Sequence, residues 1–286
     1  MKYINLDYHG KISKEYGEKL DYTITTFACG EIEFKINEKV ENEEITILQS
    51  FNVPEYNNQL IKLWIVCSVL KKNNVKNIQY IAPFLPYTRQ DRSYDATTSL
   101  GSKLVARILE ECDIKSLTTF DIHAIQVESF FTCKVLNYSA IPLFIDDITQ
   151  NYKNEKFVIV FADIGSANRF KKFFKDDTFD IAIIRKIRKP NKEIKMFVLG
   201  DIKDKTAIIL DDMIDSGGTI AEATKNLLAL GAKNVDVYAT HGRFSKNGIE
   251  RLNNLNLRKI VISNTIQHNN LPTKFQVINI DNLIIN

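Results

Sequence analysis

The sequence has no excess of charge of either sign and no apolar run of membrane length. Its 38 Lys and Arg residues nearly balance 35 Asp and Glu residues, which leaves a formal net charge of +3 at pH 7. A charge this small gives no indication of nucleic-acid binding and favours an enzyme whose basic residues act locally on anionic substrates. The N-terminus lacks the apolar core of a signal peptide, and no segment is long enough to span a bilayer. We therefore expect a cytoplasmic protein that binds neither nucleic acid nor a membrane.

Cysteine is scarce, and the few cysteines are not spaced for metal binding. The four are Cys29, Cys67, Cys112 and Cys133, with no C-x-x-C pair among them. Their spacing gives no zinc motif and no disulfide framework, and it is typical of buried thiols in a reducing compartment. The chain also has no low-complexity segment. Its 286 residues are enough for one large domain or for two of about 140 residues.

Segments of strand type alternate with helical segments in both halves of the chain. Examples are the strands Ile78 to Ala82 and Val158 to Phe161. This alternation predicts an α/β fold made of two tandem, doubly wound parallel-sheet domains. We expect a proline-containing linker near residues 139–147 to separate them, with domains at residues 1–142 and 143–286.

A helix is predicted from Asn57 to Leu70, because apolar residues recur there at helical spacing. We expect their stripe to be buried and Trp64 to belong to the core. The apolar positions are Leu60, Ile61, Trp64, Ile65 and Val69.

The stretch Ala207 to Thr219 is the most informative in the chain and reads A-I-I-L-D-D-M-I-D-S-G-G-T. The apolar residues Ala207 to Leu210 predict a strand. A helical pattern begins at Ile220 and ends at Gly231, which is a common C-terminal stop. The stretch therefore predicts a strand, an acidic loop, a glycine turn and a helix in succession.

The glycine turn suits a phosphate group, and the acidic loop suits a sugar. Two glycines let backbone N–H groups turn inward at a helix N-terminus, and Ser216 and Thr219 add hydroxyl donors. Carboxylates repel a phosphate, so the acidic residues suit sugar hydroxyls or a Mg²⁺ ion instead. Together the two ends indicate ribose 5-phosphate, and the alternative is a plain βα turn with surface carboxylates. The substrate-binding candidates are Asp211, Asp212, Asp215, Ser216, Gly217, Gly218 and Thr219.

Two further segments place polar residues after predicted strands. The loop P-F-L-P-Y-T-R-Q-D-R follows the strand Ile78 to Ala82 and contains Arg89 and Gln90. Arginine offers a rigid fork for phosphates and glutamine can pair with a base edge, but a charged surface loop has the same composition. His123 follows the predicted strand Leu117 to Phe120 and lies beside a carboxylate. Its position is equally compatible with a metal or phosphate role and with a structural role.

Taken together, these segments resemble the ribose-phosphate pyrophosphokinase family, also called phosphoribosyl pyrophosphate (PRPP) synthetases. I-I-L-D-D-M-I-D-S-G-G-T is similar to the signature loop that this family shares with phosphoribosyltransferases. P-Y-T-R-Q-D-R, D-I-H-A-I-Q-V-E-S-F-F and Y-A-T-H-G-R-F-S are similar to further segments of the synthetases. The resemblance covers nearly the whole chain, as a short-chain variant. It implies two domains of the type I phosphoribosyltransferase kind, the first for ATP and the second for ribose 5-phosphate.

The resemblance also implies roles for individual residues. F-A-C-G-E is similar to an adenine-binding F-S-D-G-E, with Cys29 in place of the family's Asp. K-I-R is similar to a flexible catalytic K-R-R, so Lys186 and Arg188 are the catalytic candidates on a mobile segment. A-D-I-G implies Asp163 as a metal ligand together with His123. The residues implied to bind ATP are Phe27, Cys29, Glu31, Arg89, Gln90, Asp91 and His123.

The implied reaction is Mg²⁺-dependent transfer of the β,γ-diphosphoryl group of ATP to the C1 hydroxyl of ribose 5-phosphate, which gives PRPP and AMP. Phosphoryl transfer of this kind depends on positioning and charge neutralisation, which agrees with the basic candidates. The resemblance further implies a homo-oligomer, either a dimer or a hexamer. Three alternatives stay open at this point: a phosphoribosyltransferase, an inactive regulatory subunit of a PRPP synthetase, and a kinase of another sugar phosphate.

Overall fold

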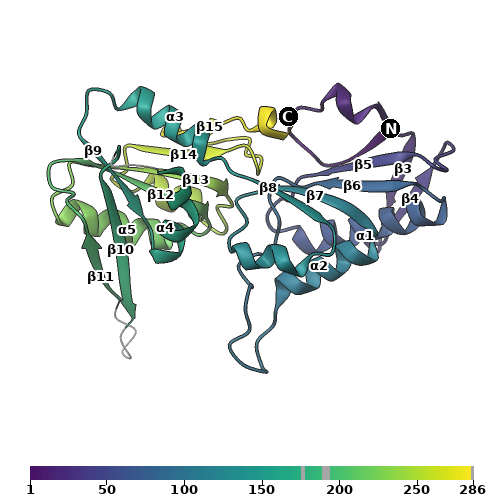
Figure 1. The fold of residues 1–286 in the computed structure, drawn as a ribbon, viewed down its shortest axis with the longest axis horizontal. Helices are drawn as coiled ribbons and strands as arrows, with labels where there is room; N and C mark the ends of the chain where they lie inside the picture. The colour runs from purple at the N-terminus through teal and green to yellow at the C-terminus, as the bar shows by residue number, and fades with distance from the viewer. Residues whose placement is uncertain (175–177, 189–193, 285–286) are drawn as a thin grey trace. The chain divides into compact units, whose positions relative to one another are not determined.

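The chain folds into two compact α/β units (Figure 1). A computed structural model describes residues 1–174, 178–188 and 194–284. The first unit holds Met1–Tyr138, Thr265–Gln267 and the residues from Asp281, and the second holds Ser139–Asn264 and His268–Ile280. The main sheet of the first unit is parallel throughout, and that of the second unit is parallel except at one edge. The predicted α/β class is therefore confirmed. Within the described ranges, no helix is both long and apolar enough to cross a membrane.

The main sheet of the first unit has six parallel strands in the order β2-β1-β5-β6-β7-β8. Helices α1 (Tyr56–Lys72) and α2 (Gly101–Glu111) connect β5 to β6 and β6 to β7. The other elements are β1 (Lys2–Leu6), η1 (Lys14–Tyr16), β2 (Glu18–Lys19), β5 (Glu44–Gln49), β6 (Asn77–Ile81), β7 (Ile114–Phe120), η2 (Ile125–Phe130), β8 (Lys134–Tyr138) and α7 (Asp281–Ile284).

Helix α1 has two apolar stripes, and the rest of the unit covers only one of them. Leu63, Val66 and Leu70 lie on the buried face. Ile61 is 46% exposed and Trp64 is 43% exposed. The prediction that Trp64 belongs to the core is therefore wrong, because spacing alone does not say which of two apolar stripes a sheet will cover.

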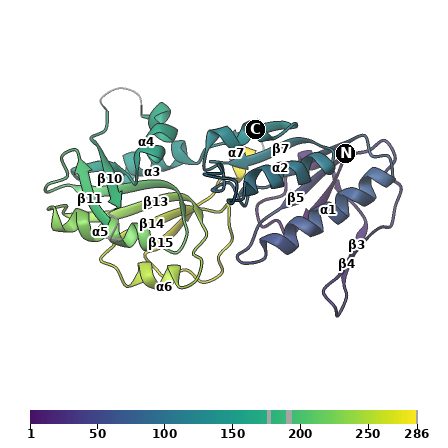
Figure 2. The ribbon, with the colours of Figure 1, turned by 90° about the horizontal axis from the view of Figure 1, so that it is seen from below.

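A separate antiparallel hairpin, β3 (Tyr22–Thr26) and β4 (Ile32–Ile36), packs against α1 (Figures 1 and 2). In both views α1 lies between this hairpin and α2. The hairpin turn is closed by the N–H of Phe27, which donates to the carbonyl of Glu31 at 2.8 Å. Gly30 has φ of +92° there, in the left-handed region that glycine adopts without strain.

The sheet of the second unit has the order β11-β10-β9-β12-β13-β14-β15, and among the described strands of this sheet only the β10–β11 pair is antiparallel. The chain leaves β9 toward β10 on one side and leaves β12 toward β13 on the other. Parallel sheets bind ligands at such a switch point, beyond the carboxyl ends of the strands. The elements are β9 (Phe157–Phe161), α4 (Ile164–Phe170), η3 (Lys171–Phe173), β10 (Ile181–Arg188), β11 (Ile194–Leu199), β12 (Thr206–Ile214), α5 (Gly218–Ala229), β13 (Asn234–Gly242), α6 (Gly248–Asn253), β14 (Lys259–Ser263) and β15 (Phe275–Ile278).

The residues expected to form a linker form helix α3 (Ile141–Asn151) instead. Pro142 lies in the first turn, where its fixed φ and its missing N–H are compatible with a helix. Ile141, Phe144 and Ile148 are buried at helical spacing. The linker prediction is wrong because it took the proline as a break rather than as a helix start.

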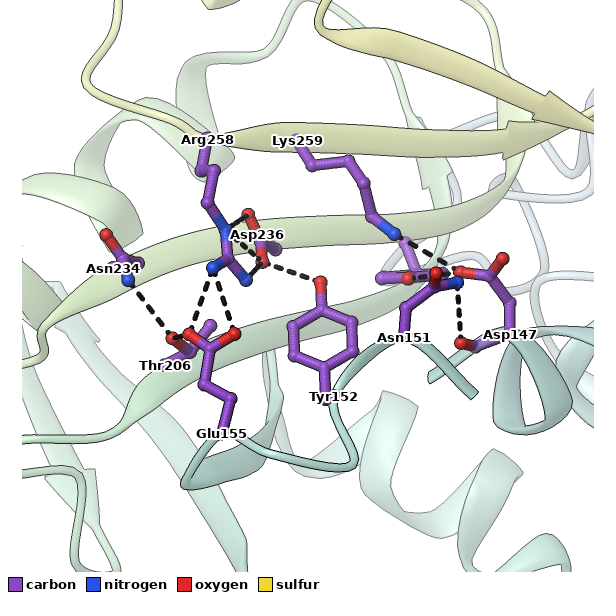
Figure 3. Close-up of polar contacts among 10 residues, drawn as sticks. Asp147, Asn151, Tyr152, Glu155, Thr206, Asn234, Asp236, Arg258 and Lys259 are labelled. Carbon is purple, nitrogen blue, oxygen red and sulfur yellow. Dashed lines mark hydrogen bonds and ion pairs between the residues drawn. The ribbon is translucent and has the colours of Figure 1, made fainter. Parts of the chain in front are cut away.

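A charged network connects the segment after α3 with the beginnings of β13 and β14 (Figure 3). Asp236 is fully buried and accepts hydrogen bonds from the Tyr152 hydroxyl at 2.6 Å and from Arg258 Nε at 3.1 Å. Arg258 Nη1 also donates to Glu155 at 2.9 Å. Burial acts to raise the pKa of Glu155, but hydrogen bonds from Thr206 and Arg258 outweigh it and hold that pKa below its ordinary value. Arg258 is thus the cation that compensates two acidic groups.

Removing this cation should destabilise the fold. We expect Arg258→Met to lower the free energy of unfolding by about 2–4 kcal/mol, because Asp236 keeps its buried charge and loses its ionic partner. Urea-induced unfolding at pH 7 measures the change. The matched control is Lys205→Met, since Lys205 pairs with Asp180 and Asp201, which are mostly exposed, and it should cost less than about 1 kcal/mol. Equal costs for the two variants would contradict the role given to Arg258.

Candidate functional site

The carboxyl ends of β9 and β12 bring two predicted acidic segments together at the switch point. Leu210 of β12 lies opposite Phe161 of β9 in the parallel register. Asp211 follows Leu210 directly, and Asp163 lies two residues beyond Phe161. The predicted metal residue and the predicted ribose residues therefore belong to one edge of one sheet.

Asp163 is held by a reciprocal capping box at the start of α4. Its Oδ1 accepts a hydrogen bond from the N–H of Ser166 at 2.7 Å, and the Asp163 N–H donates to Ser166 Oγ at 3.1 Å. Ser166 is fully buried. Asp163 Oδ2 makes no hydrogen bond within the described part of the chain. The fixed carboxylate thus keeps one hard oxygen for a ligand such as Mg²⁺, which fits that ion's preference for a few oxygen donors and retained water.

The acidic pair lies within a strand rather than in the expected loop, because β12 stays paired with β13 as far as Ile214. The N–H of Asp212 donates to Asp211 Oδ1 at 2.9 Å, so the two carboxylates are close. Arg169 of α4 makes an ion pair with Asp212 and has Nη2 3.6 Å from Asp211 Oδ1. Burial first, and then the neighbouring Asp212 charge, raise the pKa of Asp211 well above its ordinary value, and Arg169 opposes that rise.

The turn after β12 has the geometry expected of a phosphate turn. Gly217 adopts φ of +72° and caps the N-terminus of α5, which begins at Gly218. Arg251 lies at this turn, where its Nη1 donates to the carbonyl oxygen of Ser216 at 2.6 Å. A cationic side chain and a helix N-terminus at one turn favour an anionic group.

Asp215 is held by residues that follow β13. Ser245 Oγ donates to Asp215 Oδ1 at 2.5 Å, and Arg243 Nη1 lies 3.6 Å from Asp215 Oδ2. These contacts fix the start of the phosphate turn against the loop after β13.

The segment with the predicted catalytic residues is a strand at the positions that the structure describes. Lys186 and Arg188 lie in β10, opposite Met196 and Ile194 of β11. These two residues are therefore in a paired strand and not in a loop, because β11 satisfies the backbone of β10, whereas the mobility of the segment stays a prediction. Residues 189–193, which complete the predicted segment, lie outside the described residues, and so do the side chains of Lys186 and Arg188.

In the first unit, the loop with Arg89, Gln90 and Asp91 is connected to the start of α2. Ser102 Oγ donates to the carbonyl oxygen of Gln90 at 2.7 Å. Arg89 and Gln90 are exposed, whereas Asp91 is buried. Asp91 accepts a hydrogen bond from Arg92 Nη2 at 3.1 Å, so it orders the loop from within.

The predicted His123 segment approaches the same loop. Asp121 turns the chain after β7 with φ of +34°, and its N–H donates to the carbonyl of Tyr138 at 2.8 Å. His123 follows and is half-buried. Three residues further on, Gln126 Nε2 donates to Asp91, which connects the two segments.

The hairpin turn with the predicted adenine residues borders a groove that is separate from the Arg89 loop and the His123 segment. A groove of about 1100 Å³ runs between the hairpin and α1. Phe27, Cys29 and Glu31 line it, together with Ile61 and Ile65 of α1. No residue of the loop 89–91 lines this groove, nor does His123. Within one chain, the structure therefore does not bring the hairpin turn to the Arg89 loop.

Four residues that were not predicted as site residues hold the predicted ones in place. Arg243 and Ser245 belong to Y-A-T-H-G-R-F-S, a segment that the family resemblance already indicated and that fits a supporting role. Arg169 and Arg251 were missed, because a lone arginine has no pattern of its own and only the fold identifies it. Across the described ranges, no group of three or more His, Cys, Asp or Glu side chains is arranged to hold a metal ion. The four residues are Arg169, Arg243, Ser245 and Arg251.

Two family models match most of the chain. Residues 5–112 match the model described as the N-terminal domain of ribose phosphate pyrophosphokinase. Residues 171–286 match the phosphoribosyl synthetase-associated domain.

Relatives of the same kind occur in distant organisms. A ribose-phosphate pyrophosphokinase from Hyphomonas neptunium is 35% identical in an alignment of 274 residues that covers 93% of this chain and 88% of the relative. Ribose-phosphate pyrophosphokinase A from Dictyostelium discoideum is 34% identical over 91% of this chain and 84% of its own length. The crystal structure of phosphoribosylpyrophosphate synthetase from Mycobacterium smegmatis is similar with a TM-score of 0.86 and 33% identity, covering 95% of this chain and 90% of that one.

The glycine turn can be tested by stability. At Gly217 an added Cβ would lie 2.9 Å from Leu252 Cγ and would occupy a left-handed conformation. We expect Gly217→Ala to lower the free energy of unfolding by about 2 kcal/mol. At Gly218 the nearest atoms to an added Cβ are 3.8 Å away, so Gly218→Ala is the matched control and should be nearly neutral. Thermal unfolding of both variants measures the difference, and a neutral Gly217→Ala would show that the turn does not need this geometry.

Proposed function

This chain belongs to the ribose-phosphate pyrophosphokinase family and is an enzyme that forms PRPP and AMP from ATP and ribose 5-phosphate. We propose that its first unit binds ATP and that its second unit binds ribose 5-phosphate. The observation that carries this division is the β12–α5 connection. One short segment there joins an acidic pair to a phosphate turn. That combination matches a sugar phosphate and would serve poorly for a nucleoside triphosphate, whose phosphates the carboxylates would repel.

We propose that the 5-phosphate binds at the turn and that the ribose hydroxyls bind the carboxylates. The backbone of Gly217 and Gly218 and the hydroxyls of Ser216 and Thr219 would donate to the phosphate. Asp211 and Asp212 would accept hydrogen bonds from the ribose hydroxyls. Asp215 is the last of the proposed ribose 5-phosphate residues and stands at the start of the turn. Its contacts with Ser245 and Arg243 support a role in holding the turn.

For ATP, we propose two groups of residues in the first unit. Arg89 and Gln90 are exposed on an ordered loop, where a guanidinium and an amide can meet phosphates and a base edge. Asp91 orders that loop and, through its bond from Gln126, joins it to the His123 segment. The hairpin residues Phe27, Cys29 and Glu31 would contact the adenine of a bound nucleotide. Phe27 supports this role because it is a 47% exposed aromatic ring.

We propose Mg²⁺ as the metal, with Asp163 in the second unit and His123 in the first unit as candidate ligands. The ordered carboxylate of Asp163 supports the assignment, since it presents an oxygen that no other described residue uses. Mg²⁺ keeps several waters and shares substrate phosphates, so few protein ligands are sufficient. When bound, the ion would neutralise part of the charge on the ATP phosphates.

Lys186 and Arg188 are the proposed catalytic residues. Both belong to the end of β10, and β10 is next to β9, whose carboxyl end leads to Asp163. Cations there would neutralise charge that develops as the diphosphoryl group leaves AMP and reaches the C1 oxygen. The two cations would act by binding and orienting the phosphates, with no covalent intermediate.

The direct test is to incubate the purified chain with ATP, Mg²⁺ and ribose 5-phosphate and to identify the products. The proposal expects PRPP and AMP in equal amounts. Release of ADP would indicate a kinase of the ordinary type. PRPP formation only after addition of another synthetase would indicate a regulatory subunit.

Four free cysteines support assays under reducing conditions and a cytoplasmic location.

Lys186 gives the sharpest kinetic prediction. If its ammonium contacts the transferring group mainly in the transition state, Lys186→Ala should lower kcat by about 10²–10³ and raise either KM much less. The exposed Lys153→Ala is a matched control outside the site and should keep wild-type kinetics. The unfolding transition of Lys186→Ala should be nearly unchanged. A near-normal kcat in this variant would remove Lys186 from catalysis.

We also propose that the enzyme is a homo-oligomer. The hairpin residues assigned to the nucleotide line a groove that neither the loop 89–91 nor His123 lines, so a second copy could supply the hairpin turn. Exposed Trp64 and Ile61 beside the groove support a contact there. Sedimentation velocity should show a dimer or a hexamer, and Trp64→Glu should shift it toward smaller species. A wild-type monomer at micromolar concentration would contradict this proposal.

A further inference from the structure

Arg169 connects the two acidic segments of the second unit. It comes from α4, the helix that Asp163 caps, and its guanidinium reaches the carboxylates of β12. Nη2 makes an ion pair with Asp212 Oδ1 and lies 3.6 Å from Asp211 Oδ1. The side chain is only 18% exposed. Arg169 is therefore mostly buried, against the two carboxylates.

Asp212 has little access to water, so its charge depends on protein partners. Its side chain is 1% exposed, and a second carboxylate, Asp211, stands next to it in the chain. A buried carboxylate beside another one is costly unless a cation compensates it. Among the described groups near the pair, Asp163 adds a further negative charge, and Arg169 is the cation that lies against both carboxylates.

We propose that Arg169 is a positioning residue, which orients Asp211 and Asp212 to accept hydrogen bonds from the hydroxyls of ribose 5-phosphate. This inference rests on the proposed ribose site. A planar guanidinium fixes a carboxylate in direction as well as in charge. Its effect on the reaction would therefore pass through the carboxylates, and its loss would weaken the sugar substrate selectively.

The position of Arg169 on the helix that follows Asp163 explains why one residue can serve both segments. The capping box with Ser166 fixes the start of α4, and Arg169 lies one turn later. Movement of the helix start would therefore move the guanidinium that holds the acidic pair. Lysine would keep the positive charge at this position but lose the planar pair of guanidinium donors, so it should restore only part of the ribose 5-phosphate binding.

The experiment compares Arg169→Met and Arg169→Lys with the wild type by calorimetric titration. Ribose 5-phosphate and a non-hydrolysable ATP analogue with Mg²⁺ are titrated separately. We expect Arg169→Met to weaken ribose 5-phosphate binding about 10- to 100-fold, with the ATP analogue within about twofold. Arg169→Lys should fall between Arg169→Met and the wild type. Arg107→Met, an exposed arginine of α2, is the matched control and should change neither affinity.

A double-mutant cycle separates positioning from direct contact with substrate. If Arg169 acts through Asp212, adding Arg169→Met to Asp212→Asn should cost little beyond Asp212→Asn alone. The double variant removes both charges, so it should also fold if Arg169→Met alone does not. Full additivity, or an equal loss of affinity for the ATP analogue, would overturn the proposal. Because binding is measured without turnover, a wild type that binds ribose 5-phosphate but makes no PRPP would refute the proposed function and leave this test intact.

Discussion

Repulsion among carboxylates is the constraint around which the second unit is organised. Parallel pairing puts the carboxyl ends of β9 and β12 side by side, and both ends carry aspartates. A sugar-binding edge needs such acceptors, whereas a stable fold needs their charge compensated. Arg169 of α4 supplies that compensation, because its guanidinium pairs with Asp212 and lies 3.6 Å from Asp211 Oδ1. The capping of α4 and the pairing of β12 both serve this arrangement.

The same edge also separates opposite charges over a short length of chain. The aspartates end at residue 215 and the glycine turn follows at once, and Arg251 of α6 contacts this turn through the fold. Positive and negative ends thus lie at a distance set by a few residues of backbone and do not depend on how the two units move. A substrate with hydroxyls at one end and a phosphate at the other matches this polarity in one orientation only. Under the proposed assignment, one strand–turn–helix segment would set the orientation of ribose 5-phosphate.

The sequence allowed the prediction of the fold class and of the segments that meet in each unit, because apolar strands and glycine turns are local features. Asp211 and the turn from Ser216 could be recognised for that reason. The extent of β10 and β12 could not, since it depends on pairing with distant strands. Trp64 and Pro142 were misread because burial and helix starts depend on tertiary partners. The supporting contacts of Arg169 and Ser245 come from elements that only the fold brings near.

Connectivity adds a consequence for how the molecule can be divided. The backbone passes from one unit to the other after Tyr138, Asn264, Gln267 and Ile280, so each unit is made of segments that are not contiguous in sequence. Asp281 accepts a hydrogen bond from the N–H of Lys11 at 2.9 Å, which builds the last residues into the first unit. A gene fragment that stops near residue 142 would encode an incomplete body. Neither unit is therefore encoded by a single continuous stretch of the chain.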